Sequence, residues 1–254
     1  GGQMVDFAGW EMPVNYGSQI SEHNEVRENV GVFDVSHMAV FNFEGSRQVE
    51  FLEHLLPNDV NKILASTRAL YSPLLNDKGM ILDDLIVYHL GDKNFRIISN
   101  CGTRDQNNAW FKKVANNFDV RVDFKEEASI IALQGPKARH YLGEIFNVDL
   151  EPFHIQTLDG VMIARTGYTG EVGFEIISNA SRGLELWNHF IEKGIKPVGL
   201  AARDTLRLEA GFNLYGSDMT IENHPYESNL GWTIDMSNDA RDFIGKSALL
   251  DLQS

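Results

Sequence analysis

Residues 70–89, with the sequence LYSPLLNDKGMILDDLIVYH, hold two apolar runs around a turn, and this stretch decides the fold class. Residues 70–75 and 81–89 are rich in aliphatic, β-branched and aromatic side chains, which favours strands. Between them, residues 76–79 (Asn-Asp-Lys-Gly) have the chemistry of a tight turn. The pattern predicts a β-hairpin. Pro73 has no N–H to donate, so it indicates that the first strand lies at a sheet edge or a bulge.

Working outward from the hairpin, we find strand and helix patterns in irregular order along the whole chain. The periodicities predict helices at residues 18–30, 46–56, 103–116, 136–145, 184–192, 200–210 and 246–252. They predict further strands at residues 40–44, 94–99, 119–124, 129–133, 161–166, 174–177 and 232–234. Frequent hairpins favour an α+β fold with mixed or antiparallel sheets over a doubly wound parallel fold. A polar stretch at residues 125–128 predicts two subdomains, 1–127 and 128–254.

The composition excludes several classes of partner. With 22 Lys and Arg against 36 Asp and Glu, the chain carries a net charge of -14, which argues against nucleic acid and against anionic membrane surfaces. No apolar stretch approaches the ~20 residues of a membrane span. The single cysteine, Cys101, excludes an intrachain disulfide and fits a reducing, cytoplasmic setting. The chain starts at Gly1 rather than Met, so we expect its natural start, and any removed organelle-targeting segment, to precede it.

Two neighbouring carboxylates interrupt the second strand of the hairpin. Strand side chains alternate between faces, so Asp83 and Asp84 point in opposite directions among apolar neighbours. A carboxylate in apolar surroundings is easier to protonate, which is what a general acid or base requires. The alternative is that the pair ends the turn and caps backbone amides.

Residues 165–175 (RTGYTGEVGFE) form a second unusual stretch. Three glycines at threefold spacing suggest a close approach of the backbone to a ligand, although the spacing is not that of a dinucleotide fingerprint. Glu175 lies between Phe174 and Ile176, where a buried carboxylate could accept two parallel N–H bonds from an amidine-like ring edge. The alternative is a hairpin turn with a glutamate that faces solvent.

The predicted helix 200–210 places Arg203 and Arg207 on one face. Arginine suits the bidentate binding of a carboxylate, and the alternative is an exposed helix with ordinary ion pairs. The eight histidines show no metal-binding spacing, and we predict no metal site. Neither a nucleophile elbow nor a phosphate-binding loop occurs. The residues alone thus indicate an α+β enzyme with a carboxylate-rich pocket.

Several segments resemble the aminomethyltransferase family, the T-protein of the glycine cleavage system. They run in order from one end of the chain to the other. They are residues 4–13 (MVDFAGWEMP), 32–38 (VFDVSHM), 71–72 (YS), 83–88 (DDLIVY), 165–175, 199–210 (GLAARDTLRLEA), 213–216 (NLYG) and 242–246 (DFIGK). The resemblance implies a folate-binding aminomethyltransferase-type fold. It also implies a β-rich C-terminal domain that is absent from this chain, and which in the family helps to close the folate cavity.

The resemblance also implies a reaction and its partners. The one-carbon unit arrives as an aminomethyl group on the lipoyl arm of the H-protein and passes to tetrahydrofolate, giving 5,10-methylenetetrahydrofolate and ammonia. The family's essential aspartate falls on Asp84, its pterin-binding glutamate on Glu175 and its folate-contacting arginine on Arg203. Further residues are expected to line the same cavity: Tyr71, Tyr168, Met38, Ile86, Tyr88 and Asn100.

Two alternatives belong to relatives of this family. A folate-dependent demethylase would turn over a small methylated donor without any lipoyl protein. A non-catalytic folate-binding protein of cofactor or iron–sulfur assembly would lack the aspartate and carry a Lys-Gly-Cys-Tyr-x-Gly-Gln-Glu block. Asp84 is present here and Cys101 has different neighbours, so the sequence favours the enzyme.

Overall fold

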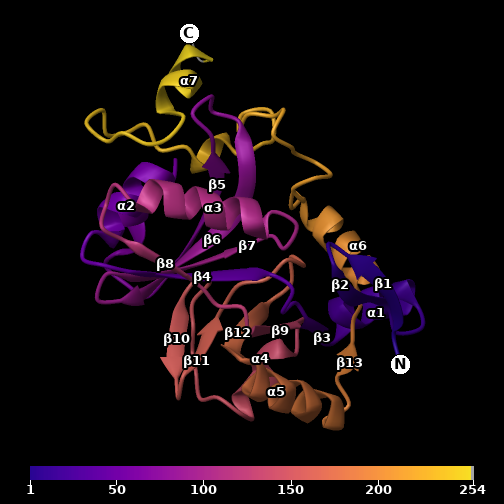
Figure 1. The fold of residues 1–254 in the computed structure, drawn as a ribbon. Helices are drawn as coiled ribbons and strands as arrows, with labels where there is room; N and C mark the ends of the chain where they lie inside the picture. Colours follow the sequence, from indigo (N-terminus) through magenta and orange to yellow (C-terminus); the bar gives the residue numbers. More distant parts are fainter. Residues whose placement is uncertain (253–254) are drawn as a thin grey trace. The chain divides into compact units, whose positions relative to one another are not determined.

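The computed structural model describes residues 1–252 and contains two compact units (Figure 1). Unit 1 comprises Gly1–His37 and Glu127–Phe212, and unit 2 comprises Met38–Glu126 and Asn213–Ser254. One crossing between the units therefore falls beside the boundary predicted at 127/128, but each unit combines two chain segments. The reason is strand pairing: β3 (Gly31–Asp34) pairs with β9 (Ala128–Gln134), so an early segment joins a late one. Composition does not reveal such a pairing.

Unit 2 is built on a five-stranded antiparallel sheet with the order β5-β6-β7-β4-β8. Its strands are β4 (Ala39–Glu44), β5 (Ala69–Leu75), β6 (Ile81–Gly91), β7 (Asn94–Ser99) and β8 (Arg121–Phe124). Helices α2 (Gln48–Leu55) and α3 (Arg104–Ala115) pack side by side on this sheet (Figure 1). Their core holds Phe41, Phe51, Leu52 and Phe111, each fully buried.

The predicted hairpin is β5 and β6, paired from Ala69 with Tyr88 to Leu75 with Ile81. Pro73 lies on β5, an edge strand of the sheet, as its missing N–H requires. The ladder is irregular between Leu74 and Leu75, which is the other device expected near the proline.

The later segment of unit 2 has little regular structure. It contains a short 3-10 helix, η2 (Gly231–Thr233), and ends in α7 (Lys246–Asp251). Another 3-10 helix of unit 2, η1 (Val60–Ile63), follows α2 in the earlier segment. The strand predicted at residues 232–234 is wrong, because Ile234 N–H bonds back to Gly231 O at 3.1 Å in a tight turn. A second core joins this segment to the hairpin through Leu75, Ile81, Met219, Leu230, Phe243 and Leu249.

Unit 1 contains a six-stranded sheet with the order β10-β11-β12-β9-β3-β13. Besides β3 and β9 its strands are β10 (Ile155–Leu158), β11 (Val161–Ala164), β12 (Gly173–Asn179) and β13 (Lys196–Pro197), and only the β13–β3 pair is parallel. Helices α4 (Ala138–Gly143) and α5 (Ala180–Glu192) cover it through Leu142, Leu186 and Phe190. The mixed, mainly antiparallel α+β class is confirmed.

The remaining elements of unit 1 surround helix α6 (Leu200–Ala210). They are the hairpin β1 (Gln3–Phe7) and β2 (Trp10–Asn15) and helix α1 (Gln19–Glu28), whose cap Ser18 accepts from Ser21 N–H. Gly211 ends α6 at a φ of 73°, a left-handed conformation that glycine adopts without strain. Within residues 1–252, no helix is both long and apolar enough to cross a membrane.

Candidate functional site

Asp83 is a fully buried carboxylate on β6 whose oxygens are occupied by neutral donors. It accepts hydrogen bonds from Asn100 Nδ2 at 2.7 Å, Thr103 Oγ1 at 2.6 Å and Asn107 Nδ2 at 2.5 Å. Burial raises the pKa of Asp83 and the three donors oppose that rise. The contacts tie β6 to the start of α3, which is a structural role.

Asp84, the next residue, points to the other face of the sheet and is only half-buried. Tyr71 Oη donates to its Oδ2 at 2.9 Å, and Asn100 Nδ2 donates to its Oδ1 at 2.9 Å. Desolvation, and then the charge of Asp83, raises the pKa of Asp84 to about 7, although Tyr71 and Asn100 favour the charged form. A carboxyl group with this pKa can hold or release a proton near neutral pH.

The other residues predicted in unit 2 share the strands around Asp84. Ile86 and Tyr88 follow Asp84 on the same face of β6; Ile86 is half-buried and Tyr88 fully buried. Half-buried Met38 and Asn100 each lie next to one residue of the terminal pair between β4 and β7, Ala39 and Ser99. Of the predicted residues, Tyr71 and Asn100 are therefore hydrogen-bonded to Asp84.

The hydroxyl at the start of α3 binds Asp83 rather than capping its own helix. Thr103 precedes α3 and makes no side-chain cap hydrogen bond; its hydroxyl donates to Asp83 and accepts from Asn107 Nδ2. Sequence reasoning missed both Thr103 and Asn107 as partners of Asp83. The available signal was the spacing of four between two polar residues in the first turns of a helix, which puts them on one face.

Glu175 lies in unit 1, in the middle of β12, and is half-buried. Its cross-strand neighbours are Ala164 on β11 and Ala132 on β9, which contribute only methyl groups to its face of the sheet. Thr166 Oγ1 donates a short hydrogen bond to Glu175 Oε2. The carboxylate is thus held from one side, with small neighbours on both adjoining strands.

The glycines before Glu175 are explained by packing within unit 1. A Cβ on Gly167 or Gly173 would meet the amide of Gln134 at 2.0–2.6 Å, and one on Gly170 would lie 3.0 Å from Ala210 Cβ. Buried Gln134 accepts from Thr169 Oγ1 at 2.9 Å and donates to Thr166 O at 3.2 Å. The close approach predicted for this loop is therefore an approach to the protein's own side chains.

Arg203 belongs to a stack of flat groups in unit 1. Its guanidinium lies 4.5 Å from the centre of the Tyr168 ring, and the Tyr168 ring stacks on Phe212 with a centroid distance of 5.8 Å. Such a cation–π arrangement presents a flat, cationic surface. Arg207 is buried and donates to Asp204 at 2.9 Å and to Phe212 O at 3.1 Å, so for Arg207 the ordinary ion pair holds.

Two further residues near this stack escaped the sequence analysis. Arg27 on α1 donates to Thr169 O at 2.7 Å, to Glu171 at 2.9 Å and to Glu209 at 2.9 Å, so it joins the glycine loop to α6. Buried His37 packs edge-on against Phe7; its burial and then the positive charge of Arg203 lower its pKa to about 3. It is therefore neutral at physiological pH. No periodicity marks either residue.

Unit 2 thus holds a titratable carboxyl with hydrogen-bond donors, and unit 1 holds a polar anchor and a cationic stack. Among residues 1–252, no group of three or more His, Cys, Asp or Glu side chains could hold a metal ion. Cys101 is buried, which raises the pKa of its thiol. This chemistry suits proton transfer and the binding of a flat polar ligand.

The family model described as the GCVT N-terminal domain matches residues 1–238. The chain belongs to the aminomethyltransferase family. An aminomethyltransferase of Francisella philomiragia subsp. philomiragia is 48% identical over 99% of this chain and 72% of its own length. One from Francisella tularensis subsp. tularensis is 48% identical over 98% of this chain and 71% of its own length.

A solved structure agrees with this assignment. The glycine cleavage system aminomethyltransferase T of Bartonella henselae superimposes with a TM-score of 0.94 at 36% identity, covering all of this chain and 72% of that one. The activity of the family is aminomethyl transfer, and the chain is an enzyme of that class. The expected family and fold are thereby confirmed, whereas the roles of individual residues stay predictions.

Proposed function

We propose that this aminomethyltransferase moves the one-carbon unit from the lipoyl arm of an H-protein to tetrahydrofolate. The carbon–sulfur and carbon–nitrogen bonds of the aminomethyl group break, and two new bonds join its carbon to N5 and N10 of the folate. The two protons lost from these nitrogens leave on ammonia and on the released thiol, so the step needs no oxidant or reductant. The products are 5,10-methylenetetrahydrofolate, ammonia and the dihydrolipoyl arm.

The observation that carries this proposal is the state of Asp84. Its pKa of about 7 lets it accept a proton from a folate nitrogen, or stabilise positive charge there, at physiological pH. Tyr71 and Asn100 fix both of its oxygens, so the group is already oriented before substrate binds. Burial is the main cause of the raised pKa of Asp84, and the neighbouring carboxyl of Asp83 adds to it.

Binding is assigned residue by residue. We propose that Glu175 accepts N–H bonds from the pterin ring edge, which its small neighbours Ala132 and Ala164 leave uncovered on the sheet face. Arg203, stacked on Tyr168, supplies a cationic plane for the folate. Lining roles for Met38, Ile86 and Tyr88 rest on the family pattern and on their positions around Asp84.

The partner is the lipoylated H-protein, with tetrahydrofolate as the co-substrate, and the proposed location is the cytoplasm. Neither nucleic acid nor a membrane is a proposed partner, in keeping with the net charge of -14.

The test is an anaerobic assay that supplies H-protein loaded with the aminomethyl group, with and without tetrahydrofolate. We expect equal amounts of ammonia and methylenetetrahydrofolate, formed only when both substrates are present. The loss of this activity in Asp84→Asn would assign the proposed role at the folate nitrogen to Asp84. Turnover of a free methylated amine without H-protein would support a demethylase and overturn the proposal.

A further inference from the structure

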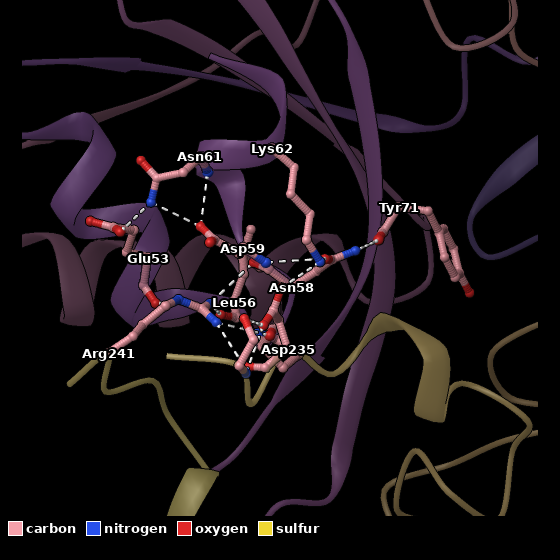
Figure 2. Close-up of polar contacts among 11 residues, drawn as sticks. Glu53, Leu56, Asn58, Asp59, Asn61, Lys62, Tyr71, Asp235 and Arg241 are labelled. Carbon is pink, nitrogen blue, oxygen red and sulfur yellow. Dashed lines mark hydrogen bonds and ion pairs between the residues drawn. The ribbon is translucent and has the colours of Figure 1, made fainter. Parts of the chain in front are cut away.

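Arg241 is a buried arginine in the later segment of unit 2, and its contacts are with backbone carbonyls. Nη1 donates to Pro57 O and Asp235 O, both at 3.2 Å. Nη2 donates to Glu53 O at 3.3 Å and Asn58 O at 3.1 Å, and also to Leu56 O. Figure 2 shows the guanidinium reaching into this group of oxygens.

These carbonyls need a donor for a structural reason. The last carbonyls of an α-helix have no partner within the helix, and α2 ends at Leu55. The end of α2 and the turn after it are buried, so water cannot serve them all, and Leu55 and Leu56 are both fully buried. A guanidinium supplies several donors in a rigid plane and a positive charge at the negative end of the helix.

A second link joins the same two segments. Lys62 Nζ pairs with Asp235 at 2.6 Å and donates to Asn58 Oδ1 at 3.1 Å (Figure 2). Asp235 N–H donates to Pro57 O at 3.0 Å, and Lys62 lowers the pKa of Asp235, which stays charged. The segment 235–241 is therefore attached to the turn at 56–62 through Asp235 at its start and through Arg241 at its end.

Asn58 passes this attachment on to the hairpin. It is buried, and its Nδ2 donates to Tyr71 O at 2.8 Å, on the edge strand β5 (Figure 2). The backbone carbonyl of Asn58 therefore accepts from Arg241, and its side-chain oxygen accepts from Lys62. Its side-chain nitrogen donates to the backbone carbonyl of Tyr71. Tyr71 carries the hydroxyl that donates to Asp84.

The fastened segment also reaches the ring of Tyr71. Trp232, in η2, stacks on the Tyr71 ring with a centroid distance of 6.0 Å and an interplanar angle of 20°. Trp232 is 69% exposed, so its place on Tyr71 depends on the backbone that carries it. Thr233 beside it is fully buried, which fixes one end of that backbone.

We propose that Arg241 is a positioning residue for the transfer reaction, because it holds Asn58 and the 232–241 segment so that Tyr71 stays hydrogen-bonded to Asp84. Arg241 acts through Tyr71 and does not touch the reacting groups. Its consequence for catalysis rests on the proposed function of Asp84, whereas its effect on Tyr71 does not.

The experiment follows the titration of Asp84 directly, by carbon-13 NMR of chain labelled at the aspartate carboxyls, with Asp84→Asn identifying the signal. The titratable groups around Asp84 are Asp83 on its own strand, Tyr71 on β5 and Tyr215, whose pKa is raised by burial and then by the two aspartates. We expect Arg241→Met to raise the pKa of Asp84 by about half to one pH unit, as the loss of the Tyr71 bond would.

A double-mutant cycle separates position from charge. Removing the positive charge of Arg241 would itself raise the pKa of Asp84, but this direct effect would persist in a Tyr71→Phe background. A positional effect disappears there, so we expect Arg241→Met to add no further shift to Tyr71→Phe. The matched control is Arg121→Met, an exposed arginine of unit 2 that pairs with Glu44, which should change nothing.

If Arg241→Met does not fold, Asn58→Ala replaces it, since that neutral change removes the link to Tyr71 O, the bond from Lys62 and the bond from Asp59 N–H, but no charge. An unchanged pKa of Asp84 in a folded Arg241→Met or Asn58→Ala chain overturns the positioning role. It is also overturned if Arg241→Met raises the pKa of Asp84 by the same amount in the Tyr71→Phe background. Full transfer activity in Asp84→Asn would instead overturn the proposed function and leave the NMR result standing.

Discussion

Asp84 and Glu175 are both carboxylates in the middle of a strand within an antiparallel part of a sheet, yet their surroundings differ. Asp84 has a second carboxylate beside it and donors on both oxygens, and its pKa rises to about 7. Glu175 has alanines on both neighbouring strands and one hydroxyl donor, Thr166. Under the proposed function, the same functional group exchanges a proton in one unit and anchors a ligand in the other.

The difference teaches where the chemistry is set. For Asp84, burial is the first cause of the raised pKa, and the neighbouring carboxyl of Asp83, which Asn100, Thr103 and Asn107 hydrogen-bond, adds to it. For Glu175 the decisive neighbours are small, because a larger side chain at Ala132 or Ala164 would cover the carboxylate. The proposal therefore assigns proton transfer to Asp84 and binding to Glu175 on the basis of what surrounds each carboxylate.

The strongest way to break this comparison is Asp84→Asn. We expect kcat for transfer to fall by about 10²–10⁴, the range for loss of a general acid or base. The dissociation constant for tetrahydrofolate should change by less than about threefold, because the lost interaction acts in the transition state. Rapid-mixing kinetics and anaerobic calorimetry measure the two. A large loss of affinity with an unchanged kcat would mean that Asp84 is an anchor like Glu175.

Asp83→Asn is the matched change on the opposite face, and its effect should be on stability. An asparagine would direct N–H groups at the donors Thr103 and Asn107, so the free energy of unfolding should drop by about 2–4 kcal/mol. Urea denaturation at pH 7.5 measures it. The idea fails if this variant keeps full stability and loses more activity than Asp84→Asn.

Glu175→Ala sharpens the other half of the comparison. The loss of charge-assisted hydrogen bonds worth ~1.5–3 kcal/mol should weaken tetrahydrofolate binding by about 10–150-fold. At saturating folate, kcat should recover most of its value. Glu171→Ala is the control, because Glu171 pairs with Arg27 instead. An unchanged dissociation constant in Glu175→Ala would remove the anchor from the proposal.

How far the sequence predicts this molecule differs between fold and site. Alternation, turn chemistry and helical periodicity predicted the β5–β6 hairpin, its edge position from Pro73, and helix α6, because these depend on near neighbours in the chain. The pairing of β3 with β9, which makes both units discontinuous, could not be predicted, since residues 31–34 carry no mark of a partner some hundred residues away.

The same limit applies to the candidate site. Alternation predicted correctly that Asp83 and Asp84 face opposite ways, but which of them is enclosed depends on Thr103 and Asn107 of α3. The spacing of Gly167 and Gly173 predicted a close approach to a ligand. In the structure these glycines make room for the side chain of Gln134, which is distant in sequence. The spacing of residues shows which side chains are unusual, and only their packing shows what they serve.

The smallest expected effect tests how finely Asp84 is adjusted. Its hydrogen bond from Tyr71 favours the charged form, so Tyr71→Phe should raise the pKa of Asp84 further, from about 7 to about 7.5–8. If the charged carboxylate is the active form, activity is lost as the pH falls through this pKa. The acidic limb of the pH profile should therefore move to higher pH in Tyr71→Phe, while activity at pH 9 stays close to the original. An alkaline limb that moves to higher pH, in place of the acidic limb, would show that the protonated acid is the active form, and an acidic limb that moves to lower pH would contradict the role of the Tyr71 hydrogen bond.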